Sequence, residues 1–275
     1  MMKNQVGHVV QPPAVAGLFY SAEPDRLEGD VDRFLSAARA SESPETRQSG
    51  RIKALIAPHA GYTYSGAIAA SAYAKLQIQA TEIRRVILFA PAHRLAFRGL
   101  AIASADSFAT PLGNVTVDTA CRQQLTGEAG SVRILDDAFQ DEHALEVQLP
   151  FLQRVLGDFG LVPILVGDAD PQEVQDVMHQ CWGGRETLVV VSSDLSHFHD
   201  YATAEQLDQR TTESIESLRP EALGQGSACG RIPIQGLLLE AKAKDLQVQT
   251  VARCNSGDTG GDRQRVVGYG AYVFH

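Results

Sequence analysis

Histidines stand just after short apolar runs in this sequence, where strands are expected to end. His59 lies in the phrase IAPHAG, and His93 lies in the similar phrase FAPAHR. In both phrases a proline ends the apolar run, so each histidine is presented from a constrained turn. A third run, TLVVVS, is followed by Asp194 and His197. Because imidazoles from neighbouring strand ends can bind one Fe, Zn or Cu ion, these positions predict a metal site.

Cys229 and His143 are further candidates for this site. Cys229 lies in ACGRIPI, just before a helical pattern over residues 232–242. A helix N-terminus favours the thiolate, which is both a metal ligand and a nucleophile. His143 lies in DEHALE, which we expect to begin a helix that places Glu146 one turn on and on the same face. That position suits a base or a partner of the metal ligands.

Each candidate also has a simpler structural interpretation. A single histidine is more often structural than a ligand, but histidines in several strand-end loops make the two interpretations about equally strong. A free cysteine is most often a small buried residue, which suits Cys121 and Cys181 because both lie in helix-like segments. The acids beside His143 could simply complement a helix dipole. Cys254 and His199 have no predicted role.

The elements that would position these residues alternate along the chain. Near-continuous apolar strands separated by helical patterns predict an α/β fold, with a central mixed, largely parallel sheet and helices on both faces. In such sheets ligands bind outside the carboxyl ends of the strands, where the candidates lie. We expect one domain over residues 1–275, with a polar surface linker at 40–50. Strands are expected at 52–57, 85–90, 161–166, 187–192, 247–252 and 266–274, and helices at 24–38, 65–78, 143–156, 171–182, 204–218 and 232–242.

Composition excludes several classes of protein. The chain has 275 residues with 24 Lys+Arg and 33 Asp+Glu, so its net charge of 24 − 33 = −9 argues against nucleic-acid binding. No apolar run approaches the roughly 18 residues that a membrane span needs. The cysteines are too widely spaced for a disulfide framework or a zinc ribbon. These observations predict a cytoplasmic protein with reduced thiols.

Several longer motifs follow one another over nearly the whole chain, and they are long enough to be specific. They are PPAVAGLFY (12–20), APHAGYTYSG (57–66), PAHR (91–94), TPLG (110–113), DEHALEVQLPFL (141–152), SSDLSH (192–197), ACGRIPI (228–234), NSGDT (255–259) and VVGYGAY (266–272). In these motifs the chain resembles the Memo family, also called AmmeMemoRadiSam system protein B. The resemblance implies a fold similar to the class III extradiol dioxygenase (LigB-like) fold, whose enzymes use non-haem Fe(II).

Carried over residue by residue, the resemblance implies a ligand set of two histidines and a cysteine. His59, His93 and Cys229 would bind the metal, and Asp194 and His197 would line the pocket. Fe(II) is the expected ion, with Cu or Zn as alternatives. The dioxygenases use two histidines and a carboxylate, whereas a thiolate favours Cu(I) or Zn and is itself open to oxidation. Dioxygenase activity therefore does not follow from the fold.

Three functions remain open on the sequence. The first is a metal-dependent, dioxygenase-like oxidoreductase acting on an unidentified small molecule, with His197 and His143 as acid or base and Asp194 as a further catalytic residue. The second is a non-catalytic metal-binding adaptor that works with AMMECR1-like and radical SAM proteins, as the family's name implies. The third is a hydrolase or transferase with Cys229 as nucleophile and His197 or His59 as base, which no local motif supports. Whether the chain is an enzyme stays open.

Overall fold

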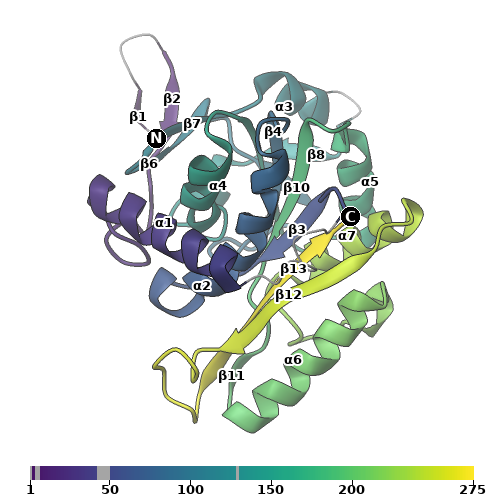
Figure 1. The fold of residues 1–275 in the computed structure, drawn as a ribbon. Coiled ribbons are helices and arrows are strands. Elements are labelled where there is room, and N and C mark those ends of the chain that lie inside the picture. The colour runs from purple at the N-terminus through teal and green to yellow at the C-terminus, as the bar shows by residue number, and fades with distance from the viewer. Residues whose placement is uncertain (1, 4–6, 42–49, 128–129) are drawn as a thin grey trace.

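The computed structural model describes residues 2–3, 7–41, 50–127 and 130–275. Strands and helices alternate along the chain, with short 3-10 turns between some of them (Figure 1). The strands are β1 (Met2–Lys3), β2 (Val9–Gln11), β3 (Ala54–Ala57), β4 (Arg85–Pro91), β5 (Leu100–Ile102), β6 (Ser107–Thr110), β7 (Gly113–Thr116), β8 (Val132–Ile134), β9 (Gly160–Val166), β10 (Thr187–Ser192), β11 (His197–His199), β12 (Val248–Asn255) and β13 (Val266–Phe274). The helices are α1 (Pro24–Ser41), α2 (Tyr62–Ala74), α3 (Thr119–Thr126), α4 (Leu149–Leu156), α5 (Pro171–Cys181), α6 (Tyr201–Glu216) and α7 (Arg231–Ala243).

The larger sheet has the predicted mixed, largely parallel character. Its strand order is β11-β13-β3-β10-β4-β9-β5-β8, and β12 pairs with β13. At its centre β3, β10, β4 and β9 run parallel. The sheet is mixed because β13 runs antiparallel to β3, β11 and β12, and β5 runs antiparallel to β9. A smaller sheet, β1-β2-β6-β7, lies to one side (Figure 1).

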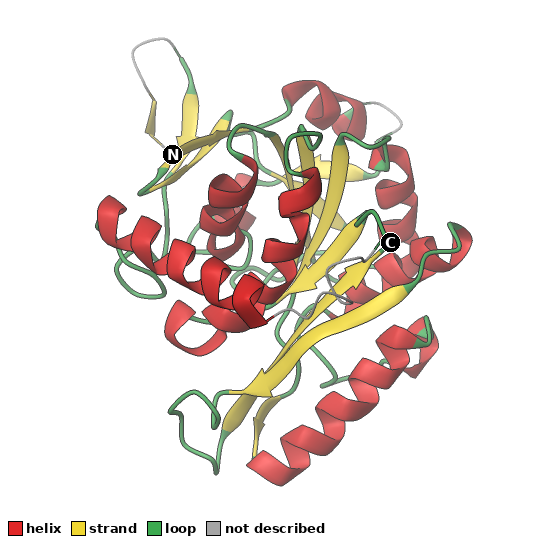
Figure 2. Cartoon of the chain, viewed as in Figure 1, coloured by secondary structure: helices red, strands yellow, loops and turns green. Residues whose placement is uncertain are grey.

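Helices cover both faces of the larger sheet, as predicted (Figure 2). Successive strand residues point to opposite faces, so in β4 Leu88 faces one apolar cluster while Ile87 and Phe89 face the other. Buried side chains of α1, α2 and α4 belong to the first cluster, and those of α3, α5, α6 and α7 to the second. Burial on both faces explains why these strands read as continuous apolar runs.

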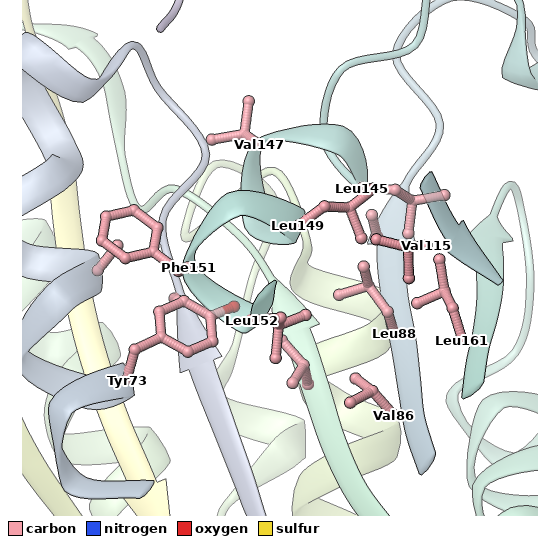
Figure 3. Packing of buried hydrophobic residues seen from close by; sticks show 14 of the residues in the cluster. Tyr73, Val86, Leu88, Val115, Leu145, Val147, Leu149, Phe151, Leu152 and Leu161 are labelled. Atoms are coloured by element: carbon pink, nitrogen blue, oxygen red, sulfur yellow. The ribbon is translucent and has the colours of Figure 1, made fainter. Parts of the chain in front are cut away.

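The first cluster is closely packed beneath the segment that carries His143. Phe151 of α4 stacks on Tyr73 of α2, with ring centroids 5.3 Å apart and planes 4° from parallel (Figure 3). Leu152 and Leu88 complete this region, and all of these side chains are fully buried. The packing fixes α4 against the sheet and so holds the turn before it in place.

Besides short elements such as β5 to β8 and α3, which the sequence pattern did not predict, the structure differs from the prediction at one helix and one linker. The helix expected over 143–156 begins only at Leu149, after a 3-10 turn at Glu146–Gln148, so His143 lies in a turn rather than on a helix. The linker expected at 40–50 begins within α1, and its residues 42–49 lie outside the described part of the chain. No helix in the described ranges is both long and apolar enough to cross a membrane.

Candidate metal centre

The candidate residues follow three neighbouring strands and lie together at one edge of the sheet. His59 follows β3 by two residues, His93 follows β4, and Asp194 follows β10, the strand that lies between them. Because these strands are parallel, their carboxyl ends meet. The ring centroids of His59 and His93 are 5.1 Å apart. The strand-end argument from the sequence therefore places these residues together correctly.

His143 joins this pair from the turn before α4. His59, His93 and His143 each offer a ring nitrogen, and these atoms all lie within 4.8 Å of one another. His59 is buried, His143 is half-buried and His93 is exposed, so the group opens to solvent on one side. The sequence interpretation gave His143 a catalytic or supporting role, whereas the structure makes it a third candidate ligand.

Hydrogen bonds at Ser192 define which nitrogen of His59 carries the proton. The Ser192 hydroxyl donates to the carbonyl of Ala144 at 2.6 Å, so it can only accept from the Nδ1 of His59, 2.9 Å away. It also accepts from the side-chain amide of Gln148. Nδ1 of His59 is therefore protonated, and its Nε2 is the acceptor nitrogen. Burial lowers the pKa of His59, which keeps the ring neutral and able to bind a metal.

Glu142 orients His93 in a similar way. Its buried carboxylate accepts the Nδ1–H of His93 at 3.1 Å and the backbone N–H groups of His93 and Ala144. Burial alone would raise the pKa of Glu142, but the contacts with His93 and Ala144 outweigh it and lower the pKa. A carboxylate that holds the far nitrogen of a histidine is a common partner of metal ligands, because it fixes the ring and raises its basicity.

The ring of His143 has an unsatisfied nitrogen. Its buried Nδ1 has no hydrogen-bond partner among the described residues, although a carboxylate oxygen of Glu142 lies 3.4 Å away. Burial lowers the pKa of His143 to about 4, so the ring is neutral near pH 7 and the contact with Glu142 is not an ion pair. A buried ring nitrogen without a hydrogen-bond partner, next to two other histidines, is compatible with a metal ligand.

Cys229 places its sulfur beside His59. The residue lies just before α7, as predicted, and its Sγ is 3.3 Å from Nε2 of His59. A nitrogen and a sulfur bound to one tetrahedral ion at normal bond lengths stand about 3.5 Å apart, so this spacing fits a shared metal. The backbone N–H of Asp194 donates to the sulfur at 3.3 Å. The expected low thiol pKa is wrong for the metal-free protein, because burial and the charge of Asp194 raise it to about 12.

Asp194 and His197 flank the cluster. Asp194 is buried, accepts the backbone N–H of His59 at 2.8 Å, and has its pKa raised by burial to about 7. His197 donates from Nδ1 to the carbonyl of Leu195 at 2.8 Å, which leaves Nε2 as an acceptor. Burial lowers the pKa of His197, so it is a neutral base near pH 7. His199 lies on the same short strand, β11, and the structure gives it no further role.

A loop near the N-terminus, residues 12–20, lies against the histidine cluster, and the sequence analysis gave it no role at the site. The ring of Phe19 meets His143 edge-on, with centroids 4.9 Å apart. Glu146 holds this loop by accepting the backbone N–H groups of Ala14 and Val15 and the hydroxyl of Tyr20. Glu146 therefore serves the loop rather than His143, which corrects the helix-face pairing that the sequence suggested. The PPAVAGLFY motif, which covers this loop, is the sequence feature that could have indicated its place at the site.

Comparisons with known proteins agree over nearly the full length. The profile of the family described as "Memo-like protein" matches residues 11–273. A MEMO1 family protein of Sulfolobus acidocaldarius is 31% identical, covering 95% of this chain and 98% of its own. Protein MEMO1 of Xenopus laevis is 33% identical, covering 84% of each chain. An uncharacterised Escherichia coli K12 protein of known structure shares the fold at a TM-score of 0.55 and 12% identity, over 81% of this chain and all of its own.

Proposed function

Because this chain belongs to the Memo family, we propose that its histidine cluster binds a metal ion and forms a non-haem redox centre for a small organic molecule. The observation that carries the proposal is the way His59 and His93 are held. Each has its Nδ1 engaged by a buried partner, Ser192 or Glu142, and each keeps Nε2 as its acceptor nitrogen. Structural histidines usually have no need of such converging acceptor nitrogens.

The donor set defines which ions suit the site. His59, His93 and Cys229 would be the ligands, and the position of His143 makes it a fourth candidate. Nitrogen donors with one sulfur suit Fe(II), the ion we propose, and also Cu or Zn. A bound redox metal would supply a Lewis acid and an electron path between the substrate and O2.

The chain's own residues would control protons and water around this centre. His197 is neutral with a free Nε2, so it can accept a proton from a substrate hydroxyl. Asp194 can take up or release a proton near pH 7, because burial raises its pKa to about 7. Phe19 shields the His143 side from solvent, while exposed His93 leaves a path for a small molecule.

Metal analysis of protein purified without oxygen tests this function. Wild type should contain about one metal ion per chain, and His59→Ala and Cys229→Ala should lose most of it. His179→Ala is the matched control, because His179 lies near the end of α5 and contacts Glu240 rather than the cluster. The iron-loaded protein should then consume O2 with catechol-type substrates, and His197→Ala should slow that consumption while keeping the metal.

Three results would contradict the proposal. A wild type that binds no Fe, Cu or Zn after reconstitution would exclude a metal centre. Metal binding that is unchanged in His59→Ala would place the ion elsewhere. A metal-loaded protein that consumes no O2 with any catechol would overturn the redox role, and would favour an adaptor that acts with AMMECR1-like and radical SAM proteins.

A further inference from the structure

Two buried thiols meet in a part of the fold that the metal centre does not use. Cys121 lies in α3 and Cys181 is the last residue of α5, and their sulfur atoms are 3.6 Å apart. The side chains belong to residues only 6% and 4% exposed. The two cysteines are 60 residues apart in the sequence, so the fold rather than a local turn brings them together.

The surroundings of this pair are well anchored. The backbone N–H of Cys121 donates to Asp118, which caps the N-terminus of α3. Asp118 is in turn bound by the guanidinium of Arg85, the first residue of β4, at 2.7 Å. The backbone N–H of Asp118 donates to the carbonyl of Leu161 near the start of β9. The pair therefore sits by the amino ends of β4 and β9, at the opposite edge of the sheet from the metal centre.

We propose that Cys121 and Cys181 form a reversible disulfide that links α3 to α5 when the protein is exposed to a peroxide. A disulfide has an S–S length of about 2.05 Å, so the sulfurs must approach by about 1.5 Å. Side-chain rotation with a small shift of α3, a helix of 8 residues, can supply that movement. The other two cysteines lie elsewhere in the fold: Cys229 is beside His59, and Cys254 is on β12.

The reaction balances with one peroxide for each disulfide. The thiolate of Cys121 attacks one peroxide oxygen, the O–O bond breaks, and the second oxygen leaves as hydroxide and takes up a proton to form water. The resulting sulfenic acid is attacked by the thiol of Cys181, which forms the S–S bond and releases a second water. Two thiols are thus oxidised by two electrons, and one hydrogen peroxide is reduced to two waters.

The assignment of roles within the pair follows from their neighbours. The hydrogen bond from Cys181 and, to a smaller extent, the positive charge of Arg85 lower the pKa of Cys121, although burial and the charge of Asp118 oppose this. The same contact with Cys121, together with burial, raises the pKa of Cys181. Cys121 lies in the first turn of α3 and Cys181 at the end of α5, so the helix dipoles also favour the thiolate at Cys121. Cys121 is therefore the thiolate that reacts first, and Cys181 resolves the sulfenic acid.

Intact-mass analysis of the full chain tests the proposal. The experiment uses metal-free protein with Cys229→Ala and Cys254→Ala, so that only this pair can react, and hydrogen peroxide as the oxidant. We expect a loss of about 2 Da, reversed by dithiothreitol, and a linked peptide that contains Cys121 and Cys181. The thermal midpoint should rise on the order of 5 °C in the oxidised protein, because the crosslink closes a long loop.

Single variants give the matched controls. With Cys181→Ser, peroxide should instead add about 16 Da at Cys121 as a sulfenic acid that dimedone captures. With Cys121→Ser, Cys181 should react much more slowly. Peptide mapping of peroxide-treated wild type supplies the same test if a variant fails to fold. Addition of oxygen without any linked peptide, or a linked peptide found only after denaturation, would overturn the proposal, and neither result depends on whether the other site binds metal.

Discussion

Replacing Cys229 by alanine tests whether its sulfur binds the metal, through the pH dependence of metal affinity. Burial and the charge of Asp194 raise the pKa of the Cys229 thiol to about 12. A metal binds the thiolate, so binding at a lower pH must displace the thiol proton. At pH 8, which is about four units below this pKa, roughly one metal-free molecule in 10⁴ has a thiolate, and each further pH unit raises that fraction about tenfold.

In one pH range, the pKa values of the neighbouring groups allow the effect of the Cys229 proton on metal affinity to be measured by itself. Between about pH 8 and pH 10, the affinity of the wild type for Zn²⁺ should rise about tenfold per pH unit after correction for hydrolysis of the ion. Burial lowers the pKa values of His59 and His143, that of His143 to about 4, so neither ring releases a proton there. Burial raises the pKa of Asp194 to about 7, so its carboxyl is largely ionised above pH 8. The slope therefore belongs to Cys229.

A competition assay with a chromophoric chelator, carried out without oxygen, measures this slope. Zn²⁺ is suitable because it has no redox chemistry that would damage the thiol. Cys229→Ala should bind more weakly, and its affinity should change little over the same pH range. Cys254→Ala is the control, since burial also raises the pKa of Cys254, to about 11, but the residue lies on β12. Equal slopes in wild type and Cys229→Ala would refute the assignment of Cys229 as a ligand.

Three further predictions concern residues around the site and in the core. Burial raises the pKa of Asp194 to about 7, so the folded state holds this proton and the stability that Asp194 contributes falls as pH rises. The buried histidines have the opposite effect, so urea titrations should compare metal-free wild type with Asp194→Asn: from pH 5 to pH 8 the wild type should lose about 3 kcal/mol relative to the variant, and an unchanged difference would contradict this role. Glu142→Gln removes the carboxylate that holds His93, so chelator competition should show metal affinity lower by roughly 10- to 100-fold, and an unchanged affinity would count against this role. Phe151→Ala removes the ring stacked on Tyr73, and urea unfolding should show a loss of about 3–5 kcal/mol, with a loss below about 1 kcal/mol contradicting the described packing.

The fold could be predicted from the sequence because its central strands are buried on both faces. Runs such as RVILFA and TLVVVS carry that signal directly, and they correspond to β4 and β10. The short strands β5 to β8 were not anticipated, since three or four residues are too few to show a periodic pattern. Strand order also lies beyond the sequence pattern, because pairing of β10 between β3 and β4 depends on contacts distant along the chain.

The site was predicted in part for the same reason. Strand ends predicted the meeting of His59, His93 and Asp194, because parallel neighbours share one edge. The position of His143 was predicted less well, since leucine spacing over 145–156 extended the expected helix too far toward it. The sequence predicts Ser192 only as the last residue of a strand. Nothing in its local sequence indicates that its hydroxyl fixes the tautomer of His59.

The hydrogen bonds around the cluster decide between a structural and a metal-binding interpretation of the histidines. In a structural histidine both ring nitrogens usually find partners within the protein. Here the partners of His59 and His93 both engage Nδ1, so their acceptor nitrogens remain for the shared space, and the buried Nδ1 of His143 has no hydrogen-bond partner in the described ranges. In the metal-free fold the Cys229 thiol can donate to Nε2 of His59, but a thiol is a weak donor, so this arrangement gains little without a metal. A cation bound among them would satisfy all of these atoms at once, and this is why the geometry favours a metal centre over a structural cluster.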